Sequence, residues 1–530
     1  MSLPKVALPI SIVLLSLAAA SFCYLTGILN LHYDGVAHLN IARRVFDHPV
    51  PHYSHLGTVW LPLQHLLLLP WVQNDFLWSR GLAGTLISVS AFWFACYYLF
   101  QLSASAYRPA AAVVSVAAFA INPNILYLQA TPLGEMLYIA LFLGVAFHLL
   151  RLAEQPGTSV LPCAACTLLA SLARYDGWLL PVWGSCVLLL VGLKRREPWR
   201  VHLPRTATYL LVASLGIVGW LAYNQIAFDD PFSFARGEHS TRRNITQIVA
   251  EAGLSHYPPY RNLSNAALYY GEAARLAAGA PLLALGTLGF VFFAWSHRRS
   301  PRFWVLGFVF LFPPVFYVAN MLTGTGIVYV PRLPPYGILN VRYAGLFLPG
   351  LCLFAPAGIQ YLSQGLQLLA GALWAKSGSV FRTGRIEQGL SLLFVAVLLA
   401  FWFLLAPPRE SFAFYQEARV NGFERKEADF AAAGFLKANY DGRPILMDVG
   451  QHGIIPQRCP IPLVRIVNEA TSWQTALARP SLFVSWIVVQ EGDGVSRFPV
   501  NWNDVQERFE VVFQTEGPFE KPLRIYRQRQ

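Results

Sequence analysis

The feature that most constrains this chain is a series of apolar runs, most of them close to the roughly 20 residues that a helix needs to cross a bilayer. The run at 61–72, LPLQHLLLLPWV, is too short to span, so we expect it to lie at the interface or to re-enter it. The sequence predicts a polytopic α-helical membrane protein with about 11 transmembrane helices. The candidate spans, of which the fifth is short, are 7–29, 80–101, 110–128, 133–151, 159–173, 178–193, 206–226, 277–295, 303–322, 343–362 and 389–406.

The composition agrees with this class of protein. Hydrophobic residues make up 55% of the 530 residues and charged residues 13%, whereas about 25% of an ordinary soluble domain is charged. The first apolar run follows Lys5 and has no clear small-residue cleavage site. We therefore interpret it as a retained first helix and not as a signal peptide.

The net charge of +12 is concentrated in a few loops. KRREPWRVHLPR (194–205), HRRSPR (297–302) and the basic residues of segment 363–388 all fall on the side of the N-terminus when the helices are counted. Positive loops mark the cytoplasmic side, so this charge orients the chain and argues against a nucleic-acid partner. The segments that then face outward are 30–79, 122–132, 174–177, 227–276, 323–342 and the tail 407–530.

The tail differs in character from the rest of the chain. A helix-like segment at 424–439 is followed by five strand-like segments at 444–449, 463–467, 481–489, 509–515 and 523–527. These predict a small extracytoplasmic α/β domain at 407–530 behind a membrane domain at 1–406. The tail contains no catalytic motif, so a docking or stabilising module is the favoured interpretation.

Asp34 is the first candidate for chemistry, because an acid beside an apolar run is costly to desolvate. An amphipathic helix is predicted behind it, and there Asp34 occupies the position of an N-cap. Capping and catalysis are equally supported, and one residue can do both. The apolar face of this helix consists of Val36, Leu39, Ala42 and Phe46, and its polar face of Asn40, Arg43, Arg44 and Asp47.

Further candidates come from other outward segments. Glu135 lies at the outward end of an apolar run, where it faces either a cavity or the interface. Arg174 and Asp176 share a short turn, and either pair with each other or act on a substrate. Arg342 follows a Pro-rich loop, and its planar guanidinium suits a phosphate or ordinary lipid headgroups.

Histidines are frequent in the first outward segment. Of the 12 in the chain, those at 48, 52 and 55 have a spacing that a transition metal can use. No HExxH motif or cysteine partner accompanies them, so interfacial histidines in a polar loop are the favoured interpretation.

At these positions the sequence resembles the GT-C superfamily of integral membrane glycosyltransferases. The similar branch contains protein O-mannosyltransferases, the lipid A aminoarabinose transferase and their bacterial relatives. The resemblance covers roughly residues 30–350. It is carried by Asp34 in a first outward loop, the T-x-x-x-E-x-L pattern from Thr131 to Leu137, RYDG at 174–177, and LPPY…N-x-R-Y from Leu333 to Tyr343.

The resemblance implies an inverting hexosyl- or pentosyltransferase whose donor sugar is carried on a polyprenyl phosphate. It implies an acceptor (lipid, glycan or protein) on the outer face, in the inner membrane of a bacterium. Asp34 takes the role of general base, and Glu135 organises the acceptor or a divalent cation such as Mg²⁺ or Mn²⁺. Arg342 holds the lipid phosphate, and Arg174, Asp176 and Tyr343 join it at the substrate. Gly35 stands where many members have a second acid, which puts a metal site at Asp34 and Glu135 in doubt.

Two other classes of function compete with this one. A lipid or glycan transporter should show repeat symmetry or broken helices at the midplane, and the sequence shows neither. A non-enzymatic assembly or sensor protein would work through its tail, and its outward acids would then be dispensable.

Overall fold

The computed structural model describes residues 3–155, 157–237, 241–373, 383–468, 473–497, 500–515 and 521–529. Within these ranges nine helical spans are long and apolar enough to cross a membrane, so the chain is an integral, multi-pass membrane protein. The main helices of these spans are α1 (Leu3–Leu25), α5 (Leu82–Ala106), α8 (Glu135–Glu154), α10 (Leu180–Lys194), α11 (Trp199–Phe228), α15 (Ala280–His297), α16 (Pro301–Thr323), α17 (Leu348–Leu373) and α18 (Thr383–Ala400).

Two shorter apolar helices occupy the third and fifth predicted spans, so each of the eleven predicted segments is helical. They are α6 (Pro109–Ala120) and α9 (Leu161–Ala173). The predicted run 110–128 is divided because Pro123 has no N–H with which to continue α6. The side chain of Asn122 accepts hydrogen bonds from the backbone N–H groups of Asn124 and Ile125, which starts α7 (Pro123–Leu128).

The helices pack closely where glycine allows two backbones to meet. A Cβ atom at Gly289 of α15 would lie 1.9 Å from the carbonyl oxygen of Phe354 in α17. Only a residue without a side chain fits there, as is common between membrane helices.

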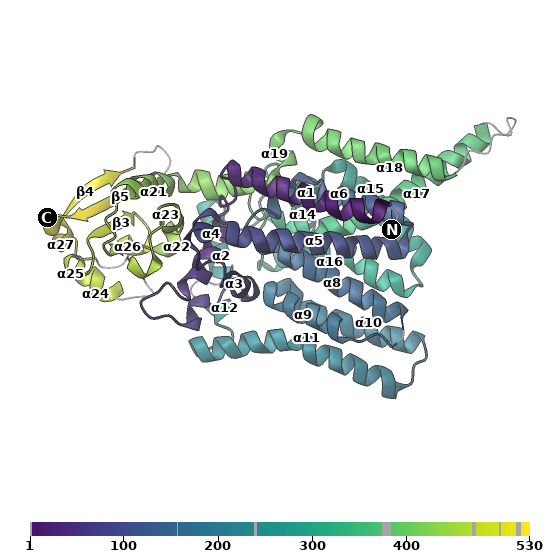
Figure 1. Cartoon of the computed structure of the whole chain (residues 1–530), viewed down its shortest axis with the longest axis horizontal. Helices are drawn as coiled ribbons and strands as arrows, with labels where there is room; N and C mark the ends of the chain where they lie inside the picture. The colour runs from purple at the N-terminus through teal and green to yellow at the C-terminus, as the bar shows by residue number, and fades with distance from the viewer. Residues whose placement is uncertain are drawn as a thin grey trace.

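The basic loops 194–205 and 297–302 lie at the N-terminal end of the bundle, as the sequence predicts (Figure 1). In the third basic segment, Lys376 and Arg382 lie outside the described residues. Lys194 donates to the backbone carbonyl of Arg299, and Arg302 pairs with Glu154 at 2.6 Å, so the ends of α8, α10 and α16 lie together. The C-terminal α/β domain is at the opposite end of the bundle (Figure 1).

Three short helices lie between the bundle and this domain, namely α2 (Tyr33–Arg44), α3 (Leu63–Leu68) and α4 (Asp75–Arg80) (Figure 1). Helix α2 is the predicted amphipathic helix. Its apolar residues Leu39 and Ala42 are fully buried and pack in one core with Leu436, Ile445 and other residues of the C-terminal domain. The apolar face of α2 is therefore covered by protein.

The C-terminal domain contains a five-stranded sheet with the order β2-β1-β3-β5-β4. The first three strands in this order are parallel and the last two pairs are antiparallel. Each strand lies within a predicted strand segment or at its edge, and α21 (Glu427–Asn439) lies within the predicted helix. The strands are β1 (Ile445–Leu446), β2 (Ile466–Val467), β3 (Trp486–Gln490), β4 (Phe509–Gln514) and β5 (Leu523–Gln528).

Candidate active site

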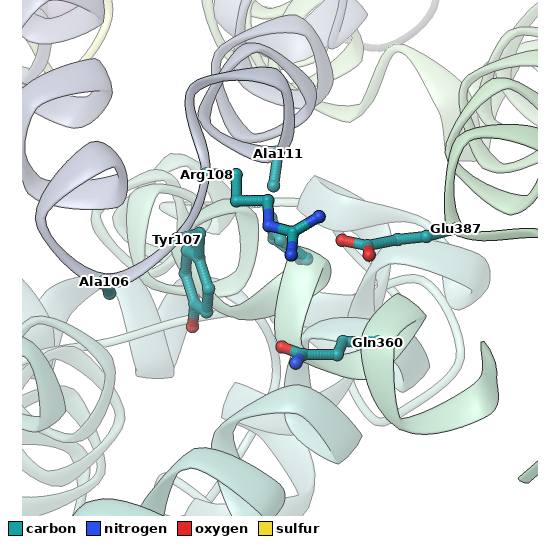
Figure 2. Close-up of a pocket in the computed structure, with 7 residues that line it drawn as sticks. Ala106, Tyr107, Arg108, Ala111, Gln360 and Glu387 are labelled. Atoms are coloured by element: carbon teal, nitrogen blue, oxygen red, sulfur yellow. The ribbon is translucent and has the colours of Figure 1, made fainter. Parts of the chain in front are cut away.

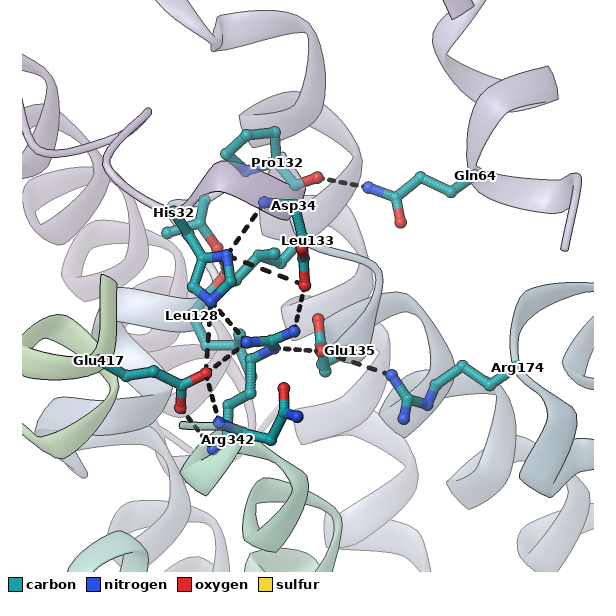
Figure 3. Close-up of polar contacts among 12 residues, drawn as sticks. His32, Asp34, Gln64, Leu128, Pro132, Leu133, Glu135, Arg174, Arg342 and Glu417 are labelled. Atoms are coloured by element: carbon teal, nitrogen blue, oxygen red, sulfur yellow. Dashed lines mark hydrogen bonds and ion pairs between the residues drawn. The ribbon is translucent and has the colours of Figure 1, made fainter. Parts of the chain in front are cut away.

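Arg342 is the centre of a buried ionic cluster (Figure 3). It bonds Asp34 of α2, so the cluster lies at the end of the bundle that faces the C-terminal domain (Figure 1). Its guanidinium donates to Glu135 through Nε at 2.8 Å, to Asp34 through Nη2 and to Glu417 through Nη1. Nη1 also lies 2.5 Å from Nε2 of His32. The Arg342 side chain is only 5% exposed, so its charge is neutralised by protein carboxylates and not by water.

The backbone before Arg342 is shaped to hold this arrangement. Arg342 lies in the 3-10 helix η3 (Val341–Phe347), and the preceding Asn340 has the left-handed φ of 55°, which asparagine tolerates better than most residues. The backbone N–H groups of Asn340 and Arg342 donate to the two oxygens of Glu417 at 2.9 and 3.1 Å. Glu417 in α20 (Ala413–Ala418) thus fixes both the backbone and the guanidinium of this turn.

Asp34 is the second residue of α2 and not its N-cap, so the predicted capping role is wrong. The cap is His32, whose Nδ1 accepts from the backbone N–H of Asp34 at 3.2 Å. The carboxylate of Asp34 is consequently free to pair with Arg342, and its side chain is 31% exposed. Burial is the largest single effect and raises the pKa of this carboxyl, but the charge and the hydrogen bond of Arg342, together with the nearby histidines, outweigh burial and hold the pKa below its ordinary value.

Glu135 links Arg342 to a second arginine. It is the first residue of α8, where the helix dipole favours a negative charge. Its Oε1 accepts from Arg342 and, at 3.4 Å, from Nη1 of Arg174 (Figure 3). Arg174 follows the end of α9 and remains 22% exposed, whereas Arg342 is almost fully enclosed.

Arg174 also makes the predicted pair with Asp176, at 3.3 Å. Asp176 lies in the 3-10 helix η2 (Tyr175–Leu179), is buried, and accepts the hydroxyl of Tyr317 at 2.9 Å. Tyr343 stacks on the ring of Tyr317, and the guanidinium carbons of Arg174 and Arg342 lie 5.2 and 5.5 Å from the centre of its ring. Tyr343 therefore holds the two arginines side by side.

The six predicted site residues thus come together in one network, although they come from four separate segments of the sequence. Their catalytic and substrate-binding roles stay predictions. Sequence reasoning missed Glu417 and His32. Glu417 lies in a segment with no motif, and its only signal was a single acid among Phe414, Tyr415 and other apolar residues just after the last span.

A divalent metal does not fit this arrangement of donors. Asp34 and Glu135 each pair with a different nitrogen of the Arg342 guanidinium, so both carboxylates already have a cation as their partner. Within the described part of the chain, no three His, Cys, Asp or Glu side chains are grouped so that they could hold a metal ion. His55, one of the three histidines with metal-like spacing, instead uses its Nε2 on the carbonyl oxygen of Val50 at 2.9 Å.

A cavity of about 330 Å³ lies elsewhere, where α5 ends and α6 begins (Figure 2). Arg108, Gln360 and Glu387 line it, but they belong to the end of the bundle with the basic loops. The cavity therefore has no part in the cluster around Arg342.

No protein-family model matches the sequence, and no curated protein matches it either. Solved structures do resemble it. ArnT from Cupriavidus metallidurans bound to undecaprenyl phosphate has a TM-score of 0.53 and 15% sequence identity, with 97% of each chain covered. The apo state of the same enzyme has a TM-score of 0.50 and 15% identity over the same shares.

A third similar structure is the apo form of the oligosaccharyltransferase from Archaeoglobus fulgidus. Its TM-score is 0.50 and its identity 12%, with 92% of this chain and 70% of the other covered. At such low identity, the likeness shows a shared fold, which extends over the membrane helices and the C-terminal domain together.

Proposed function

Since the chain has the GT-C fold, we propose that it is a membrane glycosyltransferase that moves a sugar from a polyprenyl-phosphate donor to an acceptor on the outer face. The observation that supports this most is the shared guanidinium of Arg342. It holds Asp34, a partly exposed carboxylate, beside two further acids and a second arginine at one end of the bundle. The reaction would take place at this end of the bundle.

Arg342 and Asp34 would exchange partners when the donor binds. Every nitrogen of the Arg342 guanidinium is paired with a carboxylate, and Asp34 is the most exposed of the three acids. A lipid phosphate that takes the place of Asp34 at Arg342 frees this carboxylate. Its pKa then rises, because the charge that lowers it now faces the phosphate, and Asp34 becomes a stronger base.

The transfer then needs one bond to form and one to break at the anomeric carbon. The acceptor hydroxyl oxygen attacks this carbon from the side opposite the phosphate, and its proton passes to Asp34. The bond between the anomeric carbon and the phosphate oxygen breaks, and the oxygen keeps the electron pair. Arg342 stabilises the negative charge that develops on this phosphate. Attack from the opposite side inverts the configuration of the sugar.

Arg174 and Glu135 would complete the site. Arg174 is more exposed than Arg342 and is held at Glu135, so it can reach a second phosphate oxygen without leaving the network. Asp176 is buried behind Arg174 and positions it.

The test is transfer by the purified protein in lipid nanodiscs, with a panel of polyprenyl-phosphate sugars and candidate acceptors. Asp34→Asn keeps the size of the side chain and should lower the rate by about 10²- to 10⁴-fold, the range for loss of a general base. Asp75→Asn is the matched control, because Asp75 belongs to the same outward segment and is 73% exposed. It should transfer like the native protein.

Two outcomes would contradict the proposal at different levels. Full transfer by folded Asp34→Asn would remove this residue as the base. Absence of transfer by the native protein with the whole panel, together with movement of labelled polyprenyl-phosphate lipid across the bilayer, would favour a transporter.

A further inference from the structure

A pair of histidines lies next to the Arg342 cluster and has no part in the reaction described above. His38 is in α2, one turn after Asp34, and His65 is in α3. Nδ1 of His38 lies 2.8 Å from Nε2 of His65, which is a hydrogen bond between two imidazole rings. The ring of His38 also packs on Trp60, with 4.8 Å between the ring centres.

The surroundings of the two rings differ. His65 is fully buried, and its Nδ1 is a buried atom without a partner in the described part of the chain. His38 is partly exposed. In the described part of the chain its Nε2 has no hydrogen-bond partner, and this atom is not fully buried. The pair therefore has a buried end at His65 and an open end at His38.

Burial also fixes the charge of the pair. It lowers the pKa of His38 to about 4 and the pKa of His65 well below its ordinary value, even though Asp34 and Glu135 raise the pKa of His38. Both rings are consequently neutral near pH 7, and each carries one N–H.

Two neutral rings can share this hydrogen bond in two ways. If Nδ1 of His38 is the donor, the neutral His65 ring has its own proton on Nδ1, and this buried N–H has no acceptor. If His65 donates from Nε2, only a lone pair is left unpaired there. Because a buried N–H without an acceptor is the rarer and costlier arrangement, the second way is favoured. His38 then carries its proton on Nε2, at the open end.

We infer that His65 sets the tautomer of His38, so that Nε2–H of His38 donates a hydrogen bond to the acceptor oxygen that reacts beside Asp34. This inference rests on the proposed function. It assigns His38 to the acceptor and leaves the phosphate to the arginines. His65 is a positioning residue, because it acts only through His38.

The stereochemistry of the acceptor explains why such a donor is useful. A hydroxyl oxygen has one bond to carbon, one O–H and two lone pairs. If its proton points to Asp34 and one lone pair accepts from His38, the other lone pair is the one left to attack the anomeric carbon. Two partners thus fix the orientation of the nucleophile, whereas a single partner would leave it free to rotate.

The first experiment measures the tautomer without any need for activity. Protein labelled with ¹⁵N-histidine is studied by NMR in nanodiscs at pH 7, and the two signals are assigned from the spectra of His38→Gln and His65→Phe. We expect the Nε2–H form of His38, and loss of this single form in His65→Phe. A signal for the Nδ1–H form in the native protein would overturn the inference.

The second experiment uses the transfer assay with varied acceptor. His38→Phe keeps a flat ring without a donor, and should raise the acceptor KM or lower kcat about tenfold, the effect of one lost hydrogen bond, with the KM of the lipid donor unchanged. His38→Gln offers an N–H at a similar reach and should restore most of the loss. His52→Gln is the control, because His52 is exposed on the same outward segment.

The outcomes separate this inference from the proposed function. Transfer that is abolished by Asp34→Asn but unchanged in His38→Phe would overturn the role of His38 and leave the glycosyltransferase intact. A change confined to the KM of the lipid donor would assign His38 to the phosphate and overturn the inference as well. Absence of transfer in the native protein would overturn both.

Discussion

Arg342 donates both its backbone N–H and its guanidinium to the carboxylate of Glu417. The backbone bond to Oε2 is 3.1 Å long, and the guanidinium bond goes to Oε1. Glu417 is fully buried and lies in the segment after the last membrane helix, 75 residues further along the chain. One carboxylate therefore ties the end of the bundle to the beginning of the C-terminal region.

Removal of Glu417 should destabilise the protein. Glu417→Ala leaves the buried Arg342 without one of its three carboxylates and two backbone N–H groups without acceptors. Breaking a buried ion pair costs about 3–5 kcal/mol, so we expect a clearly lower thermal midpoint in detergent. Glu417→Gln keeps one carbonyl acceptor, so its thermal midpoint should lie between those of the native protein and Glu417→Ala. Equal midpoints for the native protein and Glu417→Ala would show that this pair has no structural role.

The contact of the C-terminal domain with α2 depends on Asp47, which follows the helix. Its two oxygens accept the backbone N–H groups of Leu463 and Val464 at 3.0 and 3.1 Å. Asp47→Asn has only one acceptor oxygen and loses one of the two hydrogen bonds, at a cost of about 0.5–1.5 kcal/mol. Hydrogen–deuterium exchange of a peptide covering 460–468 should become faster.

Asp75→Asn is the control for this measurement, because Asp75 binds Arg43 at 2.6 Å, as Asp47 does at 2.9 Å, but its side chain is 73% exposed. Exchange that is unchanged in Asp47→Asn, or equally fast in both variants, would contradict the role given to Asp47.

The stability of the C-terminal domain should depend on pH through His452. This ring is fully buried between Asp429 at 2.6 Å and Asp493 at 3.2 Å. Burial lowers the pKa of His452, but the two carboxylates outweigh burial and raise it to about 9 from 6.5. The stabilisation is therefore complete below about pH 6.5 and lost as the pH rises through 9, and a difference of this size corresponds to about 3 kcal/mol.

Thermal midpoints at pH 6.5 and 9.5 would check this dependence. The native protein should be less stable at the higher pH, and His452→Gln, which cannot titrate, should show a smaller difference between the two. If both proteins lose the same stability between these pH values, the dependence has another origin.

Chelation should leave transfer unchanged. The carboxylates of Asp34 and Glu135 both bind the guanidinium of Arg342, so both already have a cation as their partner. Exhaustive EDTA treatment followed by dialysis should therefore not lower the rate. A loss that Mg²⁺ or Mn²⁺ restores would show that a cation enters the site when substrate binds.

Much of the fold was predictable because the bilayer imposes a length and a polarity on each membrane helix. All eleven apolar runs are helical. Helix α2 lies where the helical spacing of apolar and polar residues predicts it. Asn122 and Pro123 indicate the division between α6 and α7, but hydropathy alone predicts one continuous helix there. The cap of α2 was misjudged by two residues, because His32 and Asp34 can both accept from a helix N-terminus and only the backbone path chooses between them.

The candidate site was predicted in part. Asp34, Glu135, Arg174 and Arg342 stood out because charged side chains at the ends of apolar runs are costly without a partner. Glu417 did not stand out, because nothing in its segment indicates that it folds back onto Arg342. The sequence also suggested that Arg342 was free to bind phosphate, whereas the structure pairs its guanidinium with three carboxylates.

The sequence by itself determined that the chain is a membrane protein, which apolar segments form helices, and which charged residues need partners. Each of these follows from the cost of placing a polar group in hydrocarbon, and this cost is a property of a short segment alone. Only the tertiary structure decided which residues pair with one another. Arg342 meets Asp34, Glu135 and Glu417 at separations of 308, 207 and 75 residues, and contacts of that range depend on how the whole bundle packs.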